Sequence, residues 1–165
     1  TFREVHPDYP GRRMVIVGDV LHSRVARSTS TLFHKLGIEV GVLGPGTLIP
    51  PGRHEFIRRF RSWDEVFDWK PDAVYLLRVQ LERQEGMFFP SIAEYHKMYG
   101  MNTERLVRMR QIGAYLMHPG PVNRGVEITD EAMRYERSLI STQVENGIAV
   151  RMAVLHWLKP ETDND

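Results

Sequence analysis

The sequence contains no cysteine among its 165 residues. A chain without thiols forms no disulfide and no thiolate metal site, and it has no cysteine nucleophile. No apolar run approaches the roughly 20 residues that a membrane-spanning helix needs, and the opening residues TFRE do not resemble a signal peptide. The lack of cysteine is compatible with any compartment, and we expect a cytoplasmic protein with no membrane partner.

The sequence also lacks an excess of either charge, since 22 Lys and Arg residues stand against 21 Asp and Glu residues. This balance gives no reason to expect nucleic acid as a partner. A hydrophobic share of 42% and a charged share of 26% are ordinary for a globular protein, and the length suits one domain. Because the chain begins with Thr1 and not with Met, we expect a processed or truncated protein.

Several site motifs are absent as well. The sequence has no glycine-rich dinucleotide motif and no phosphate-binding P-loop, and its seven histidines show no metal-ligand spacing. It has no recognisable Ser-His-Asp or paired-carboxylate order, so no catalytic residue can be named with certainty. We therefore expect neither a cofactor nor a bound metal.

Short apolar runs predict four strands, at residues 14–18, 38–43, 73–77 and, more weakly, 115–117. Helical spacing of apolar residues and capping signals predict helices between them, at residues 24–36, 62–69, 104–112 and 130–136. Strands that alternate with helices and are apolar on both faces indicate an α/β fold. We expect a mostly parallel sheet with helices on both faces.

Two arginines follow predicted strands at the sheet edge where open α/β sheets bind their ligands. Arg24 starts a helix, where a cation is unfavourable unless an anion joins it. Arg78 directly follows five apolar residues. Two guanidinium groups at neighbouring strand ends suit a small dicarboxylate. The alternatives are that Arg24 points into solvent behind a Ser23 cap, or that Arg78 pairs with Glu82 or Asp19.

A third cluster, at residues 118–124, follows the fourth predicted strand. Pro119 and Pro121 have no N–H group, so this segment offers carbonyl oxygens, which favour a ligand with N–H donors. The Gly120-Pro121 bond has the weak trans preference that permits a cis peptide. A rigid turn without a ligand is the alternative, and His118 is open to either a structural or a catalytic reading.

These clusters resemble segments of the aspartate transcarbamoylases, in the same order along the chain. The similarity runs from about residue 1 to residue 158, and it is carried by VGDVLHSRVARS at 17–28, GPGTLIP at 44–50, LRVQLER at 77–83, HPGPVNRGVEI at 118–128 and QVENGI at 143–148. The resemblance is to the C-terminal, aspartate-binding domain of the catalytic chain, which is Rossmann-like.

The resemblance implies transfer of a carbamoyl group from carbamoyl phosphate to the amine of L-aspartate, an early step of pyrimidine biosynthesis. It implies that Arg24, Arg78 and Gln80 bind L-aspartate. It also implies that the backbone of Gly120 and Pro121 contacts carbamoyl phosphate and the incoming amine. No residue of the chain is an evident general base, and in the family the departing phosphate itself can take the proton.

One departure limits the activity expected of this chain. The Ser-Thr-Arg-Thr-Arg motif, which grips phosphate in the other domain of the family, appears nowhere in the sequence. We therefore expect the chain alone to be inactive. Two alternatives remain: a non-catalytic domain that binds a small dicarboxylate, and an ornithine transcarbamoylase, which is disfavoured because that enzyme has a His-Cys-Leu-Pro segment at this place.

The family pattern also predicts an organisation. We expect a lead-in between domains at residues 1–12, the aspartate-binding domain at 13–137, a C-terminal helix at 138–158 and a tail at 159–165. The helix carries an apolar stripe and should pack back on an N-terminal carbamoyl-phosphate domain. The stripe consists of Ile140, Val144, Ile148, Met152 and Leu155. The resemblance implies a homotrimer of catalytic chains, with regulatory chains or a dihydroorotase as further candidate partners.

Overall fold

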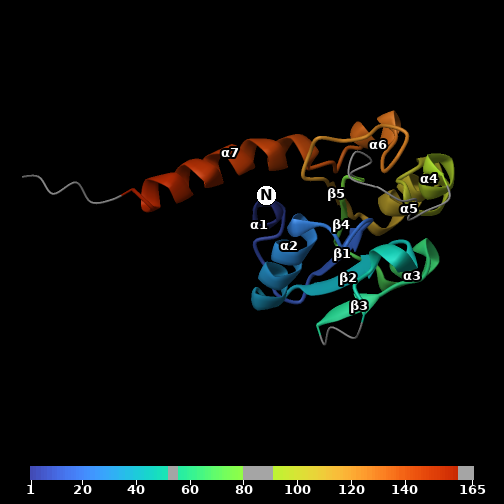
Figure 1. Cartoon of the computed structure of the whole chain (residues 1–165), viewed down its shortest axis with the longest axis horizontal. Helices are drawn as coiled ribbons and strands as arrows, with labels where there is room; N and C mark the ends of the chain where they lie inside the picture. Colours follow the sequence, from blue (N-terminus) through green and yellow to red (C-terminus); the bar gives the residue numbers. More distant parts are fainter. Residues whose placement is uncertain (52–55, 80–90, 160–165) are drawn as a thin grey trace, which may run out of the picture.

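The computed structural model describes residues 1–51, 56–79 and 91–159. Its centre is a parallel sheet with the strand order β3-β2-β1-β4-β5 (Figure 1). The strands are β1 (Arg13–Val17), β2 (Glu39–Leu43), β3 (Ile57–Arg59), β4 (Ala73–Leu76) and β5 (Tyr115–Met117). All pairings among these five strands are parallel, which confirms the predicted α/β class.

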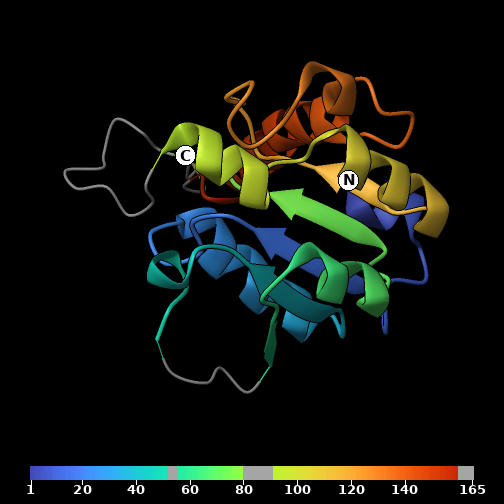
Figure 2. The same cartoon turned by 90° about the vertical axis from the view of Figure 1, so that its right-hand side faces the viewer.

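Helices cover both faces of the sheet. They are α1 (Phe2–Val5), α2 (Arg24–Lys35), α3 (Trp63–Trp69), α4 (Ile92–Tyr99), α5 (Thr103–Ile112), α6 (Asp130–Met133) and α7 (Ile140–Trp157), with a short 3₁₀ turn η1 at Gly46–Leu48. In Figure 2, α3, α4 and α5 lie in front of the sheet, whereas α1 and α2 lie behind it.

The alternation of side chains along β1 shows how the two layers form. Val15 and Val17 join a core cluster with residues of α3, α5 and α6. Met14 and Ile16 point the other way, into a second cluster with Phe2 of α1 and residues of α2. Every one of these strand residues is almost fully buried. A parallel strand covered on both faces reads as a continuous apolar run, which is why β1 was predictable.

The ends of the predicted helices follow local signals. Ser23 caps α2 by accepting a hydrogen bond from the Ala26 N–H at 3.1 Å, and Gly37 follows this helix with a φ of +75°, the left-handed conformation that favours glycine. Ser62 caps α3 by accepting from the Glu65 N–H. These contacts confirm the helix starts that the sequence indicated.

Four elements were not predicted: α1, the short turn η1, α4 and β3. Gly86, Pro90 and Gly100 and the weak periodicity of residues 80–102 predict a mobile loop in this segment. In the structure α4 occupies part of it, opened by Ser91, which accepts a hydrogen bond from the Glu94 N–H. The rest of that prediction, at residues 80–90, lies outside the described residues. The edge strand β3 was also missed, because its Arg58 and Arg59 are exposed and give no apolar signal.

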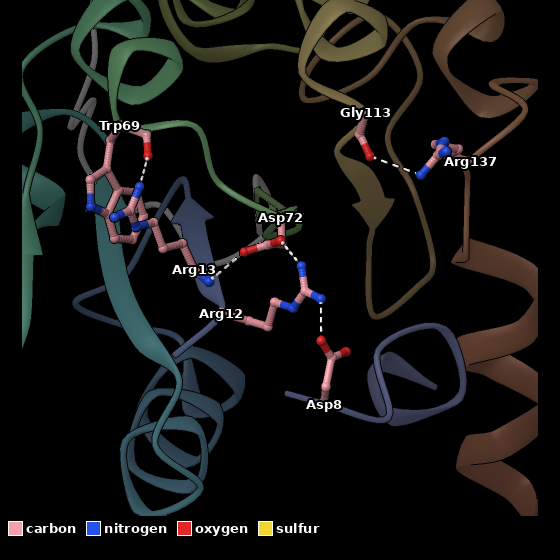
Figure 3. A network of polar contacts seen from close by, with 7 residues as sticks. All are labelled: Asp8, Arg12, Arg13, Trp69, Asp72, Gly113 and Arg137. Carbon is pink, nitrogen blue, oxygen red and sulfur yellow. Dashed lines mark hydrogen bonds and ion pairs between the residues drawn. The ribbon is translucent and has the colours of Figure 1, made fainter. Parts of the chain in front are cut away.

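The first twelve residues pack closely on the rest of the chain. Arg12 donates to Asp72 at 2.9 Å and also bonds Asp8, and the Arg13 N–H donates to the other oxygen of Asp72 at 2.8 Å (Figure 3). To the right of this network in Figure 3, Arg137 donates to the Gly113 carbonyl at 3.0 Å. Residues 1–12 are therefore in contact with the part of the chain that follows. The expected role of this segment as a lead-in between domains stays a prediction.

Helix α7 begins in the core and then leaves it. Ile140 is buried, and Gln143 donates to the Tyr75 hydroxyl at 2.7 Å. Asn146, one turn further along, donates to the Thr1 hydroxyl and to the Glu4 carboxylate. Beyond these contacts the helix extends away from the body (Figure 1). None of the helices among the described residues is long and apolar enough to cross a bilayer.

Candidate functional site

The loops that follow β1, β4 and β5 meet in one pocket. Strand β4 pairs with β1 on one side and with β5 on the other, so the carboxyl ends of the three strands are adjacent. The pocket has a volume of about 330 Å³ and is lined by Asp19, His22, Ser23, Arg24, Val25, Leu77, Arg78, Pro119, Gly120 and Pro121. The structure thus brings both predicted arginines to the same pocket as the predicted Gly120-Pro121 segment.

The loop after β1 is folded around Asp19. The carboxylate of Asp19 accepts from the His22 backbone N–H at 3.0 Å and lies 3.0 and 3.1 Å from the His22 ring nitrogen Nδ1. Ser23 then caps α2, so Arg24 is the first helical residue. The cap and the pocket position of Arg24 were weighed as alternatives, but both occur together. Asp19 and His22 belong to a segment that the sequence placed at the ligand-binding edge of the sheet, but neither was predicted to bind the ligand.

Arg78 is positioned by its two neighbours in the sequence, which are buried. Leu77 and Val79, on either side of Arg78, are almost fully buried, while Arg78 itself is partly exposed and lines the pocket. The predicted ligand Gln80 and the alternative ion-pair partner Glu82 lie outside the described residues. The role given to Gln80 therefore stays a prediction.

The loop after β5 approaches the pocket with its backbone. The Gly120-Pro121 peptide is cis, as the sequence allowed. Gly120 has a φ of +64°, and a Cβ atom at this position would lie 3.3 Å from a methyl carbon of Val144 in α7. Both observations explain why glycine suits this position. Pro121 offers a carbonyl but no N–H group, in keeping with the predicted preference for a ligand with N–H donors.

His118 belongs to the interior and not to the pocket lining. Its side chain is fully buried, and its Nδ1 atom accepts a hydrogen bond from the Gly120 N–H at 2.9 Å. Its Nε2 atom lies 3.3 Å from Glu127, which is also buried. These contacts favour the structural reading of His118. The sequence reasoning missed Glu127, although the HPGPVNRGVEI motif contains it.

A larger cavity, of about 580 Å³, lies elsewhere and is lined in part by His34, Glu39, Ile57, Arg58 and Trp69. Glu39 and Ile57 are the first residues of β2 and β3, so this cavity lies at the amino ends of the strands. Ligands of open α/β sheets bind at the carboxyl ends. We therefore favour the smaller pocket, in which two permanently charged guanidinium groups and a carbonyl-bearing loop converge.

The pocket chemistry suits a small anionic amino acid. Each guanidinium can hold one carboxylate through two hydrogen bonds, and the backbone carbonyls can accept hydrogen bonds from an amine. Within residues 1–51, 56–79 and 91–159, no group of three or more His, Asp and Glu side chains is placed to hold a metal ion.

Comparisons with known proteins show which family the chain resembles. The family described as "Aspartate/ornithine carbamoyltransferase, Asp/Orn binding domain" matches residues 10–158. The aspartate carbamoyltransferase catalytic subunit of Akkermansia muciniphila is 61% identical over 164 residues, which cover 99% of this chain and 53% of that protein. The chain thus spans about half the length of this curated relative.

Solved structures show a similar fold. Aspartate transcarbamoylase of Trypanosoma cruzi, in complex with carbamoyl aspartate and phosphate, matches with a TM-score of 0.77 and 24% identity, over 93% of this chain and 52% of that chain. Ornithine carbamoyltransferase of Thermus thermophilus matches with a TM-score of 0.74 and 22% identity, over 93% and 50%. At these identities the likeness shows the fold alone.

Proposed function

The chain belongs to the aspartate/ornithine carbamoyltransferase family, and we propose that it supplies the L-aspartate site of an aspartate carbamoyltransferase. The enzyme would transfer a carbamoyl group from carbamoyl phosphate to L-aspartate, giving N-carbamoyl-L-aspartate and phosphate in pyrimidine biosynthesis. The observation that carries this proposal is the convergence of Arg24, Arg78 and the Gly120-Pro121 segment on one pocket.

The proposed roles follow from the chemistry of each group. Arg24 and Arg78 bind the two carboxylates. Gln80, two positions after Arg78 in the sequence, adds a further contact to L-aspartate. The carbonyls of Gly120 and Pro121 receive the N–H groups of the amine and of carbamoyl phosphate. Aspartate held in this way has its amine fixed relative to the carbonyl that it attacks, which lowers the entropic part of the barrier.

The remaining chemistry requires groups from outside this chain. Attack of the amine places negative charge on the carbonyl oxygen, and preorganised donors must stabilise that charge. We propose that these donors and the phosphate grip come from an N-terminal carbamoyl-phosphate domain, and that the departing phosphate accepts the proton from the amine. The N–C bond forms as the bond from carbon to the phosphate oxygen breaks.

The assembly is also a proposal. The stripe on α7 supports packing against the carbamoyl-phosphate domain, and the family pattern supports a homotrimer of catalytic chains, with regulatory chains or a dihydroorotase as further candidate partners. The cytoplasmic location stays a prediction from the sequence.

The experiment that tests the site replaces each arginine in the full-length protein that carries this chain. Arg24→Gln and Arg78→Gln each remove charged hydrogen bonds worth about 1.5–3 kcal/mol, so kcat/KM for L-aspartate should fall roughly 10- to 150-fold. KM should rise and kcat should fall, because a misplaced amine affects the transition state.

Arg27→Gln is the matched control. Arg27 lies one turn beyond Arg24 on the same helix and lines a shallow surface hollow, not the pocket. Its removal should leave the kinetics within about twofold, since surface substitutions have small effects. Unchanged kinetics in both pocket variants, or equal losses in all three, would contradict the assignment.

A further inference from the structure

Two buried ionisable side chains lie directly behind the pocket and have no role in the proposed function so far. His118 is completely buried and Glu127 is 2% exposed. Burying such groups is unfavourable unless hydrogen bonds compensate the loss of water. Their partners therefore indicate what the pair does.

The hydrogen bonds fix the position of the imidazole proton. His118 Nδ1 accepts from the Gly120 N–H at 2.9 Å, and a ring nitrogen that accepts cannot also hold a proton. A neutral ring with this acceptor has its proton on Nε2, which lies 3.3 Å from the Glu127 carboxylate oxygen Oε1 but does not have the geometry of a hydrogen bond to it. The same Glu127 oxygen accepts a short hydrogen bond from the Asn123 N–H. Two backbone N–H groups of the segment after His118, those of Gly120 and Asn123, thus donate to the buried pair.

The contacts hold the pocket segment at both ends. Residues 119–123, which we call the carbonyl loop, are bonded near their start by Gly120 and at their end by Asn123. The side chain of Asn123 also donates to the Val79 carbonyl at 2.7 Å, and Val79 directly follows Arg78. A shift of the carbonyl loop towards or away from Arg78 would break one of these partly buried hydrogen bonds.

We propose that His118 and Glu127 are positioning residues that hold the carbonyl loop where its carbonyls receive the N–H groups of the amino acid's amine. This inference rests on the proposed function. It divides recognition between two sets of groups. The arginines, on other loops, bind the carboxylates, while the His118-Glu127 pair acts through the carbonyl loop on the N–H groups of the amine and of carbamoyl phosphate and not on the carboxylates.

A comparison of two ligands separates these roles. L-Aspartate has two carboxylates and an amine, whereas succinate has the same carboxylates and no amine. Both variants are made in the full-length protein. Glu127→Gln removes the charge of the carboxylate that accepts from the Asn123 N–H. His118→Leu removes the acceptor for the Gly120 N–H. A buried bond of this kind is worth about 1–3 kcal/mol. We expect kcat/KM for L-aspartate to fall roughly 5- to 150-fold, with the inhibition constant of succinate changed less than about threefold.

Two further variants distinguish an effect on the carbonyl loop from a general loss of stability. His118→Asn keeps an acceptor near the position of Nδ1 and should retain more activity with L-aspartate than His118→Leu does. Tyr135→Phe removes another buried hydrogen bond, from the Tyr135 hydroxyl to the Ala114 carbonyl at 2.9 Å, away from the pocket. It should lower the melting temperature and leave the kinetics with both ligands unchanged.

The outcomes distinguish the inference from the proposed function. If Glu127→Gln and His118→Leu weaken succinate as much as L-aspartate, the pair does not act on the amine and the inference is overturned. If the unaltered protein neither carbamoylates L-aspartate nor is inhibited by succinate, the proposed function fails as well. A selective loss with L-aspartate, together with partial rescue by His118→Asn, supports the positioning role.

Discussion

Single side chains set the charge of the pocket. The guanidinium groups of Arg24 and Arg78 stay protonated at all physiological pH values, so the capacity to bind a dianion does not depend on a titrating group. Asp19 contributes the opposite charge, and the backbone and ring of His22 hold its carboxylate. The arginines were predictable because they follow apolar strands. The contacts of Asp19 were not, because sequence spacing does not reveal how a loop folds back on itself.

His6 gives a pH-dependent prediction at the same scale. Its ring lies 4.9 Å from that of Phe2 and 5.3 Å from that of Tyr115. Burial, followed by the positive charge of Arg12, lowers the pKa of His6 from 6.5, while Asp72 and Asp8 act against this and Arg137 adds to it. The unfolded chain therefore binds the proton more readily than the folded one. The stability contributed by His6 is present above 6.5 and is lost as the pH falls below that value.

The measurement is urea unfolding of the unaltered chain and of His6→Gln across this range of pH. The unaltered chain should lose more stability than the variant on acidification, because glutamine does not titrate. Parallel stability curves for the two proteins would show that His6 is not responsible.

At the scale of elements, the strands and helices with a strong apolar pattern were predictable and the peripheral ones were not. The prediction of strands at 14–18, 38–43, 73–77 and 115–117 is confirmed by β1, β2, β4 and β5. β3 pairs on one side only, and two of its three residues are exposed, so burial leaves no pattern in its sequence. The Gly and Pro residues around α4 favoured a loop, although Ser91 and Glu94 supply a capping signal for this helix.

Helix α7 leads to a prediction about association. Along the expected stripe, the exposed fraction rises from 6% at Ile140 to 52% at Ile148 and 71% at Leu155. An exposed apolar stripe of this kind favours burial against another surface. The chain alone should therefore self-associate with rising concentration, and Ile148→Lys combined with Leu155→Lys should reduce that association, as measured by sedimentation velocity.

Leu32→Lys provides the control for this experiment. Leu32 is 54% exposed on α2, outside the stripe, so its replacement should not change the association. A chain that stays monomeric at every concentration before any substitution would contradict the prediction that α7 needs a partner surface.

At the scale of the whole molecule, the chain spans about half the length of its curated relatives. In the proposed function the pocket orients an amino acid, but the phosphate-binding motif of the family does not occur in the sequence. Electrostatic stabilisation of the developing oxyanion is usually the largest single contribution to such catalysis. Under the proposed function, orientation of the amino acid by this chain and stabilisation of the oxyanion by another domain act together.

The most direct test is the initial rate of carbamoyl transfer from carbamoyl phosphate, measured with L-aspartate and with L-ornithine. The assay uses the purified chain alone and the chain mixed with a separately produced carbamoyl-phosphate domain. We predict no appreciable turnover by the chain alone, and turnover of L-aspartate but not of L-ornithine once the second domain is supplied. Full turnover by the chain alone, or carbamoylation of L-ornithine in preference to L-aspartate, would contradict the claim that this chain is the aspartate-binding half of the enzyme.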